Sequence, residues 1–255
     1  MKQAKPYLPL KFIYCHKENS RRLSRTKLST GEVSSHRSYT YKFLKSSVLT
    51  HTPGGTLYIT GGTSPQQVVC ILASRDFAVT YQPPMLQGRK SHASTYFKGK
   101  IFVLGGYHHD NISDCEEFSI QDCRWDSIQP LPRACSYSTA IALESLNCMY
   151  ALGGCNPLSL ETIQRYSFES LAWDLMDLVL PYPDISIACY KKDEELLYFI
   201  QAAKLFCFNP RSSIEEIKSL PKNLKSTNGE SFFSNGKLYC SSEMGPAHTL
   251  ELSNG

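Results

Sequence analysis

The sequence predicts an all-β protein of about six repeated units, each a sheet of four short antiparallel strands. Three observations support this prediction: an apolar strand motif ending in two glycines recurs, the spacing of its copies is nearly constant, and helical periodicity is almost absent. One four-stranded sheet cannot bury both faces alone, whereas sheets stacked around an axis can. We therefore predict a β-propeller whose two end units are incomplete.

The repeated motif is clearest in the middle of the chain. LYITGG ends at Gly62, IFVLGG at Gly106 and MYALGG at Gly154, and KFIYCH, LYFIQA and LYCSSE are weaker copies. The period of 41 to 48 residues is in the range of propeller blades. We predict a single domain over residues 1–255. Its blades are expected near the six motif starts, which are Lys11, Leu57, Ile101, Met149, Leu197 and Leu238.

Other landmarks keep the same phase. Trp125 and Trp173 each lie 24 residues before the next motif copy, where we expect the fourth strand of a blade. A glycine or asparagine, the residues that tolerate positive φ in tight hairpins, stands just before four of the copies. Counting strands from this phase predicts four complete blades and an end blade of three strands at each terminus.

Composition excludes several classes of protein. Hydrophobic residues make up 42% of the 255 and are spread along the chain, as in a folded protein. No stretch approaches the roughly 18 to 20 apolar residues of a membrane span, and the start lacks the apolar core of an export signal. The ten cysteines form no C-x-x-C pair. We therefore predict a cytoplasmic protein with reduced thiols, no zinc or other metal site, and no cofactor.

Charge is uneven along the chain. The net charge is +4, but residues 1–45 hold 11 Lys and Arg against only Glu18 and Glu32. Such a basic end could contact phosphate or an acidic surface, although a solvated strand face is the favoured interpretation. No aromatic residues alternate with these cations as single-strand binders require, so we do not expect a nucleic-acid partner.

The middle units resemble the kelch repeat family. The residues that carry the resemblance are the LGG motifs at Leu104–Gly106 and Leu152–Gly154, an aromatic residue seven before a tryptophan at Phe118/Trp125 and Tyr166/Trp173, and Leu131-Pro132-Arg133. The glycines are replaced in the outer copies by Cys15-His16, Gln201-Ala202 and Ser241-Ser242. The resemblance implies a six-bladed propeller and a protein-binding role.

An enzymatic role is the alternative to protein binding. Copper oxidases of the galactose oxidase type resemble the architecture, and the chain offers His108 and His109 next to each other. Adjacent side chains in an extended loop point apart, so we do not expect them to chelate one ion. No E-x-x-x-D-x-x-x-H, G-x-S-x-G or phosphate-binding loop motif is present. We predict that the protein is not an enzyme; the alternative is a propeller enzyme acting on a sugar, an oxidase or a sialic acid mutarotase.

The resemblance also implies where a partner would bind. In BTB-kelch substrate adaptors, ligand contacts come from the residue after the double glycine and from the arginine after the blade-entry proline. For the two arginines, inter-blade packing against backbone carbonyls is the alternative role. The candidate protein-binding residues are Thr63, Arg89, Tyr107, His108, His109, Asp110, Arg133 and Cys155.

The predicted function is a protein-binding scaffold or recognition module with a protein or peptide partner on its loop face. Kelch families imply two kinds of partner, ubiquitin-ligase components and the actin cytoskeleton. A ligase adaptor normally carries a BTB or F-box segment, for which 255 residues of blades leave no room. The chain would then be a fragment of a longer protein.

Overall fold

A computed structural model shows the arrangement of the chain. All of its regular elements within the described residues are β-strands. The described residues are 12–16, 19–27, 30, 32–37, 41–72, 77–158, 160–182, 187–191, 196–202, 204–219, 231–234, 237–242 and 245–251.

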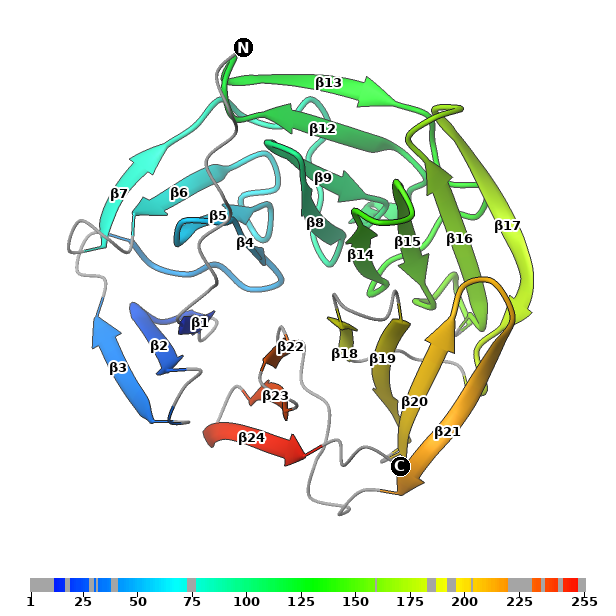
Figure 1. Cartoon of the computed structure of the whole chain (residues 1–255). Helices are drawn as coiled ribbons and strands as arrows, with labels where there is room; N and C mark the ends of the chain where they lie inside the picture. The colour runs from blue at the N-terminus through cyan, green and yellow to red at the C-terminus, as the bar shows by residue number, and fades with distance from the viewer. Residues whose placement is uncertain are drawn as a thin grey trace, which may run out of the picture.

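The described strands form six blades around a central axis (Figure 1). Blade 1 contains β1 (Phe12–His16), β2 (Arg22–Lys27) and β3 (Val33–Arg37). Blade 2 contains β4 (Val48–His51), β5 (Thr56–Thr60), β6 (Val68–Leu72) and β7 (Ala78–Tyr81). Blade 3 contains β8 (Ala93–Phe97), β9 (Lys100–Leu104), β12 (Cys115–Ser119) and β13 (Arg124–Ile128).

The second half of the ring continues in the same way. Blade 4 contains β14 (Thr139–Leu143), β15 (Cys148–Leu152), β16 (Thr162–Ser167) and β17 (Ala172–Val179). Blade 5 contains β18 (Ile187–Lys191), β19 (Leu196–Gln201), β20 (Lys204–Asn209) and β21 (Ser213–Ser219). Blade 6 contains β22 (Ser231–Ser234), β23 (Lys237–Ser242) and β24 (Gly245–Glu251).

Each complete blade runs outward from the axis in chain order. Blade 2, for example, has the order β4-β5-β6-β7, and all pairs are antiparallel. The first strands of blades 2 to 6 lie next to one another in turn, and β1 lies beside β4 and β23 (Figure 1). These findings confirm the predicted all-β propeller, and within the described residues the two end blades have three strands each. The assignment of residues 1–255 to one domain stays a prediction.

One small element was not predicted from the sequence. Two short strands, β10 (Tyr107–His108) and β11 (Asp110–Asn111), form a separate ribbon after the double glycine of blade 3. The ribbon gives this loop a regular structure that the corresponding loops of blades 2 and 4 do not have in their described residues.

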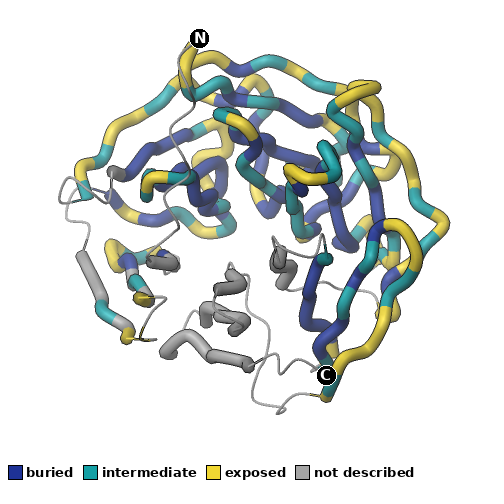
Figure 2. The backbone as a smooth tube through the Cα atoms, viewed as in Figure 1, coloured by how far each residue is buried: buried dark blue, intermediate teal, exposed yellow. Residues whose placement is uncertain are grey.

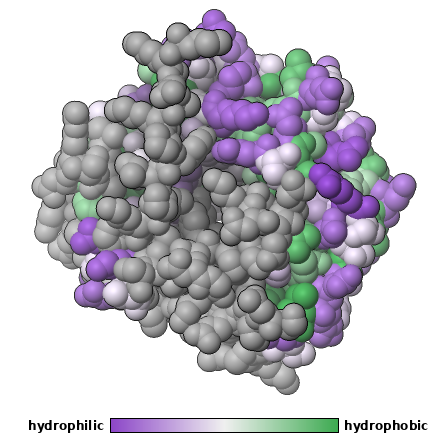
Figure 3. Space-filling model, in the orientation of Figure 1, coloured by the Kyte–Doolittle hydropathy of each residue, from purple (hydrophilic) through white to green (hydrophobic). Residues whose placement is uncertain are grey.

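The hydrophobic core lies between the blades. Four clusters of buried side chains fill the interfaces of blades 1 and 2, 2 and 3, 3 and 4, and 4 and 5. Figure 2 shows that the second strands of the blades, such as β9 and β15, are mostly buried, while exposed positions recur along the outer strands. On the face in view, described hydrophilic and hydrophobic residues are intermixed along the upper right of the rim (Figure 3). Stacking of neighbouring sheets therefore provides the burial that a single sheet lacks.

The double glycines allow loops to approach the strand ends closely. At Gly106 the φ angle is +108°, and a Cβ atom would lie 2.8 Å from the His92 Cβ and 2.9 Å from the Lys90 carbonyl oxygen. At Gly61 a Cβ atom would lie 2.3 Å from the carbonyl oxygen of Arg89. Any side chain at these two positions would push away the loop that leads into blade 3. The geometry gives these glycines a structural role.

The two tryptophans hold the outer strands against the linkers that enter their blades. Trp125 is 5% exposed and packs on Phe118, with ring centres 5.1 Å apart. Its indole N–H donates to the Pro83 carbonyl oxygen at 2.9 Å. Trp173 makes the same contact one blade later, donating to the Gln129 carbonyl oxygen at 2.8 Å, but it is only half-buried.

We expect Trp125→Ala to lower the free energy of unfolding by about 3 kcal/mol, because it opens a cavity between blades 2 and 3 and removes a hydrogen bond. Trp173→Ala is the matched control and should have a smaller effect, since its ring is already partly in solvent. Urea unfolding followed by circular dichroism measures both variants. An unchanged midpoint for Trp125→Ala would contradict the position of this ring in the core.

Candidate functional site

Two sets of loops meet at one end of the blades. We call the segments leading into blades 3, 4 and 5 the entry loops (residues 82–92, 129–138 and 180–182). The segments after the double glycines are the glycine loops (residues 61–67, 105–114 and 153–158). Lys90 and Tyr107 exchange two backbone hydrogen bonds, of 3.1 and 2.8 Å, and Ser136 and Cys155 do the same at 3.1 and 2.8 Å. The glycine loops of blades 3 and 4 are thereby joined to the entry loops of their own blades, whereas the glycine loop of blade 2 bonds to the entry loop of blade 3 through Gly62 and Arg89.

Neighbouring blades are connected at the same end. The Tyr137 N–H donates to the Ser91 carbonyl oxygen at 2.7 Å, and the Ser91 N–H donates to the Ser46 carbonyl oxygen at 3.0 Å. These three residues precede the axial strands of blades 4, 3 and 2, and their φ angles are +57°, +52° and +58°. Left-handed backbone at non-glycine residues is strained and persists where the surroundings impose it. The hydrogen bonds therefore fix this part of the surface around the axis.

The connected loops present a group of accessible side chains, which we call the mouth surface: Lys90, Tyr107, Arg133, Tyr137 and Cys155. Tyr107 is 37% exposed, Tyr137 is 55% exposed, and Lys90 and Arg133 are also exposed. The Lys90 ammonium lies 5.1 Å from the centre of the Tyr107 ring, within the range of a cation–π contact. Cys155 is half-buried, with its thiol 3.4 Å from the Ser136 hydroxyl.

Beneath the mouth surface, buried side chains hold the entry loops. Glu116 accepts hydrogen bonds from the N–H groups of Leu86 and Gln87 at 2.7 and 2.9 Å. In blade 4, Gln164 accepts from the Arg133 N–H at 2.8 Å and donates to the Arg133 carbonyl oxygen at 3.1 Å. Glu116 and Gln164 occupy the same place in the third strands of their blades, opposite Val103 and Ala151.

Comparison with known proteins agrees with this architecture. The kelch motif model matches residues 88–132, which span blade 3. Kelch-like protein 40 of Xenopus laevis is 27% identical over 144 residues, covering 54% of this chain and 22% of that protein. The chain therefore contains a kelch motif and has the fold of a kelch-type β-propeller. The mouse and human Kelch-like protein 23 are each 25% identical over 173 residues, covering 63% of this kelch propeller and 30% of those proteins.

The kelch propeller thus spans less than a third of the length of these relatives. Among solved structures, that of YjhT is similar with a TM-score of 0.63 and 12% identity, covering 77% of this chain and 71% of that one. At this identity the likeness shows the fold alone.

The prediction that the protein is not an enzyme was wrong. YjhT has the same fold although its sequence is only 12% identical. One fold can serve many functions. The lack of a known catalytic motif is therefore no ground for excluding an enzymatic activity. Within the described residues, no three His, Cys, Asp or Glu side chains gather as a metal site, and no helix is long and apolar enough to cross a membrane.

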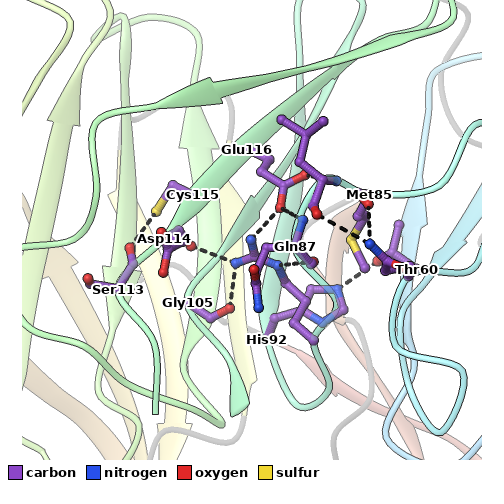
Figure 4. Close-up of polar contacts among 12 residues, drawn as sticks. Thr60, Met85, Gln87, His92, Gly105, Ser113, Asp114, Cys115 and Glu116 are labelled. Carbon is purple, nitrogen blue, oxygen red and sulfur yellow. Dashed lines mark hydrogen bonds and ion pairs between the residues drawn. The ribbon is translucent and has the colours of Figure 1, made fainter. Parts of the chain in front are cut away.

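Arg89 is not on the surface, contrary to its prediction as a binding residue. It is fully buried and forms an ion pair with Glu116 at 2.5 Å. Its guanidinium also donates to the carbonyl oxygens of Gly105 at 2.8 Å, Asp114 at 2.6 Å and Gln87 at 3.3 Å. Figure 4 shows these groups converging between the entry loop and the strands of blade 3. Arg89 therefore has the alternative role that was predicted for it, packing against backbone carbonyls.

The expectation that His108 and His109 point apart was also wrong. Their rings touch edge to face, with centres 4.6 Å apart. His109 has a φ angle of +62°, and in this left-handed conformation the side chains do not alternate as they do in an extended strand. His109 and Asp110 are exposed on the ribbon and His108 is half-buried.

The remaining candidates lie in loops of blades 2, 3 and 4. Tyr107, Arg133 and Cys155 belong to loops that are joined by hydrogen bonds, whereas Thr63 is exposed on the glycine loop of blade 2. Sequence reasoning missed Lys90 and Tyr137. Their signal was their place in the repeat: each lies two or three residues before the start of an axial strand, where the chain must turn toward the axis.

Proposed function

We propose that this kelch propeller binds a protein or peptide partner through its mouth surface. The observation that carries the proposal is the pair of exposed rings, Tyr107 and Tyr137, connected through Lys90 and Ser91 by backbone hydrogen bonds. Tyrosine and arginine are the residues that most often dominate binding energy at protein interfaces, and Arg133 lies on the same entry loop as Tyr137.

The rigidity of the mouth surface supports this function. A loop already held in its binding conformation loses little entropy when a partner binds. Here the left-handed Tyr137 backbone is fixed by its bond to Ser91, and the Arg133 backbone by both bonds to Gln164. The side chains are therefore presented from positions that do not need to be ordered by the partner.

We propose a recognition module within a larger protein or assembly, as in the Kelch-like relatives that exceed this chain in length. The two roles we propose for this surface are substrate presentation to a ubiquitin ligase and attachment to the actin cytoskeleton. The identity of the partner distinguishes the two roles. The cytoplasmic location stays a prediction.

Arg133→Ala combined with Tyr107→Ala should reduce partner capture from lysate by about tenfold or more, because two exposed anchors are removed. Tyr137→Gly should have a similar effect, and since glycine accepts left-handed backbone without strain, it should not lower the melting temperature. Quantitative mass spectrometry of captured proteins and thermal unfolding measure the two effects.

Tyr81→Ala combined with Arg124→Ala is the matched control, because both residues are exposed on outer strands away from the mouth surface. This control should capture the wild-type set of proteins. Equal capture by all variants would refute the site, and a large fall in melting temperature for the first double variant would show that its residues are structural.

A further inference from the structure

A serine or threonine directly precedes proline at two places in the chain, Thr52-Pro53 and Ser64-Pro65. Proline-directed protein kinases recognise this dipeptide and phosphorylate the hydroxyl group of its first residue. Two residues are too short a signal for the sequence alone to identify a modification site. The structure separates the two positions, because it buries one hydroxyl group and exposes the other residue.

Thr52 is not accessible to a kinase. It is 4% exposed and lies in the turn between β4 and β5. Its hydroxyl group donates to the Thr56 carbonyl oxygen at 2.9 Å, and its backbone N–H donates to the same oxygen at 2.9 Å. A phosphoryl group could reach this hydroxyl only after the hairpin of β4 and β5 had opened.

Ser64 lies in the glycine loop of blade 2, where residues 63–66 are all exposed. The Gln67 N–H donates to the Ser64 carbonyl oxygen at 2.9 Å, which closes a turn with Pro65 at its second position. Proline is favoured at this position because its fixed φ angle fits the turn. The Ser64 side chain is therefore presented to solvent at the start of a defined turn.

This turn is joined to the entry loop of blade 3 on both sides of Ser64. The Gly62 N–H donates to the Arg89 carbonyl oxygen at 3.1 Å, and the Arg89 N–H donates to the Pro65 carbonyl oxygen at 2.9 Å. Lys90 follows Arg89 directly, and its side chain is exposed. The backbone hydrogen bonds thus place one exposed lysine beside the turn.

A second exposed lysine approaches from blade 2. A Cβ atom at Gly62 would lie 2.8 Å from the Lys45 carbonyl oxygen, so the segment leading into β4 contacts the same loop. The Lys45 side chain is exposed. Lys45 and Lys90 therefore belong to the two segments that contact the glycine loop of blade 2 next to Ser64.

The surroundings of Ser64 are cationic. The glycine loop of blade 2 (residues 61–67) and the segments at residues 41–47 and 82–92 contain no Asp or Glu. Of their four basic residues, Arg89 is already paired with Glu116. A phosphoserine carries about two negative charges near pH 7 and gains charge-assisted hydrogen bonds where cations surround it. These loops favour a phosphate electrostatically.

We propose that Ser64 is a phosphorylation site for a proline-directed protein kinase, with the phosphate held by Lys45 and Lys90. The γ-phosphoryl group of ATP passes to the Ser64 Oγ, so that the Oγ–P bond forms and the bond from this phosphorus to the β-phosphate oxygen breaks. The hydroxyl proton is released and ADP leaves. The phosphate would compete for Lys90 with the Tyr107 ring, whose centre lies 5.1 Å from the ammonium.

Treatment of the full 255-residue chain with a purified proline-directed kinase and ATP tests the site. Mass spectrometry should find about one phosphate per chain, on Ser64, and none on Thr52. Ser64→Ala and Pro65→Ala should each lower incorporation by about tenfold or more. Thr63→Ala is the matched control, because it removes the neighbouring exposed hydroxyl, and it should keep wild-type incorporation. No incorporation into the folded chain, or incorporation unchanged by Ser64→Ala, would overturn the site.

Phosphorus NMR of the phosphorylated chain tests the two lysines. The second pKa of a phosphoserine is about 6, and nearby cations lower it because they favour the doubly charged form. Lys45→Gln/Lys90→Gln should raise this pKa by about 0.5 relative to the wild type. Lys98→Gln/Arg124→Gln removes two exposed cations from other loops and strands, and it should leave the pKa unchanged. Equal pKa values in the wild type and both variants would overturn the role of the lysines.

Discussion

Arg89→Cys is expected to lower the free energy of unfolding by about 3 to 5 kcal/mol, because it leaves the carboxylate of Glu116 buried without its partner. The side chains of the pair are 0% and 2% exposed, so bulk water does not solvate the carboxylate. Three further hydrogen bonds to backbone carbonyls disappear with the guanidinium. Chemical denaturation of the variant and the wild type measures the difference.

The equivalent site in blade 4 supplies the compensating change. There Cys135 stands in the place of Arg89, and Gln164 in that of Glu116, with the Gln164 amide 3.9 Å from the Cys135 sulfur. The double variant Arg89→Cys/Glu116→Gln should therefore recover most of the lost stability, although Glu116→Gln alone should be destabilising. A double variant as unstable as the sum of the single ones would show that the two blades are not interchangeable at this site.

Acid is expected to destabilise the kelch propeller by on the order of 5 kcal/mol between pH 7 and pH 4, through His51 and His92. Burial lowers the pKa of His51 to about 3, and burial together with the nearby Arg89 charge lowers the pKa of His92 to about 3. Both are neutral in the folded protein and take up a proton near pH 6.5 when unfolded. Stability is therefore fully present above pH 6.5 and is lost as the pH falls toward 3.

The hydrogen bonds of these histidines explain why neutrality matters. The His51 Nε2 accepts from the Tyr14 N–H at 2.9 Å, and the His92 Nε2 lies 2.7 Å from the Thr60 hydroxyl. Protonation would remove the acceptor that Tyr14 uses between blades 1 and 2. Urea unfolding at several pH values gives the slope of stability against pH.

Variants separate these two histidines from the other titrating groups. His51→Gln/His92→Gln should flatten the slope between pH 6.5 and 4, whereas His109→Gln, at an exposed site, should leave it unchanged. A slope in the first variant equal to that of the wild type would assign the acid sensitivity to other groups.

The fold class was predictable because its signals are local and repeated. Gly99 and Asn147 mark hairpins through their own tolerance of positive φ, and both have it, at +85° and +50°. Gly106 also has a positive φ angle, of +108°, and its lack of a side chain lets the entry loop of blade 3 approach closely. A periodic pattern of short apolar strands then requires stacking of sheets, since no single sheet of this kind buries its apolar faces. These properties follow from the sequence without knowledge of any distant contact.

The roles of individual side chains depended on contacts between segments far apart in the chain. Arg89 and Arg133 both follow a blade-entry proline, but only the tertiary structure places Glu116 beside the first and a Gln164 amide against the backbone of the second. His109 faces His108 because its left-handed backbone is set by the loop. The sequence by itself determined the propeller, because strands, turns and their period are local properties of the chain. The tertiary structure decided which side chains are buried, because burial depends on which distant residue fills the neighbouring space.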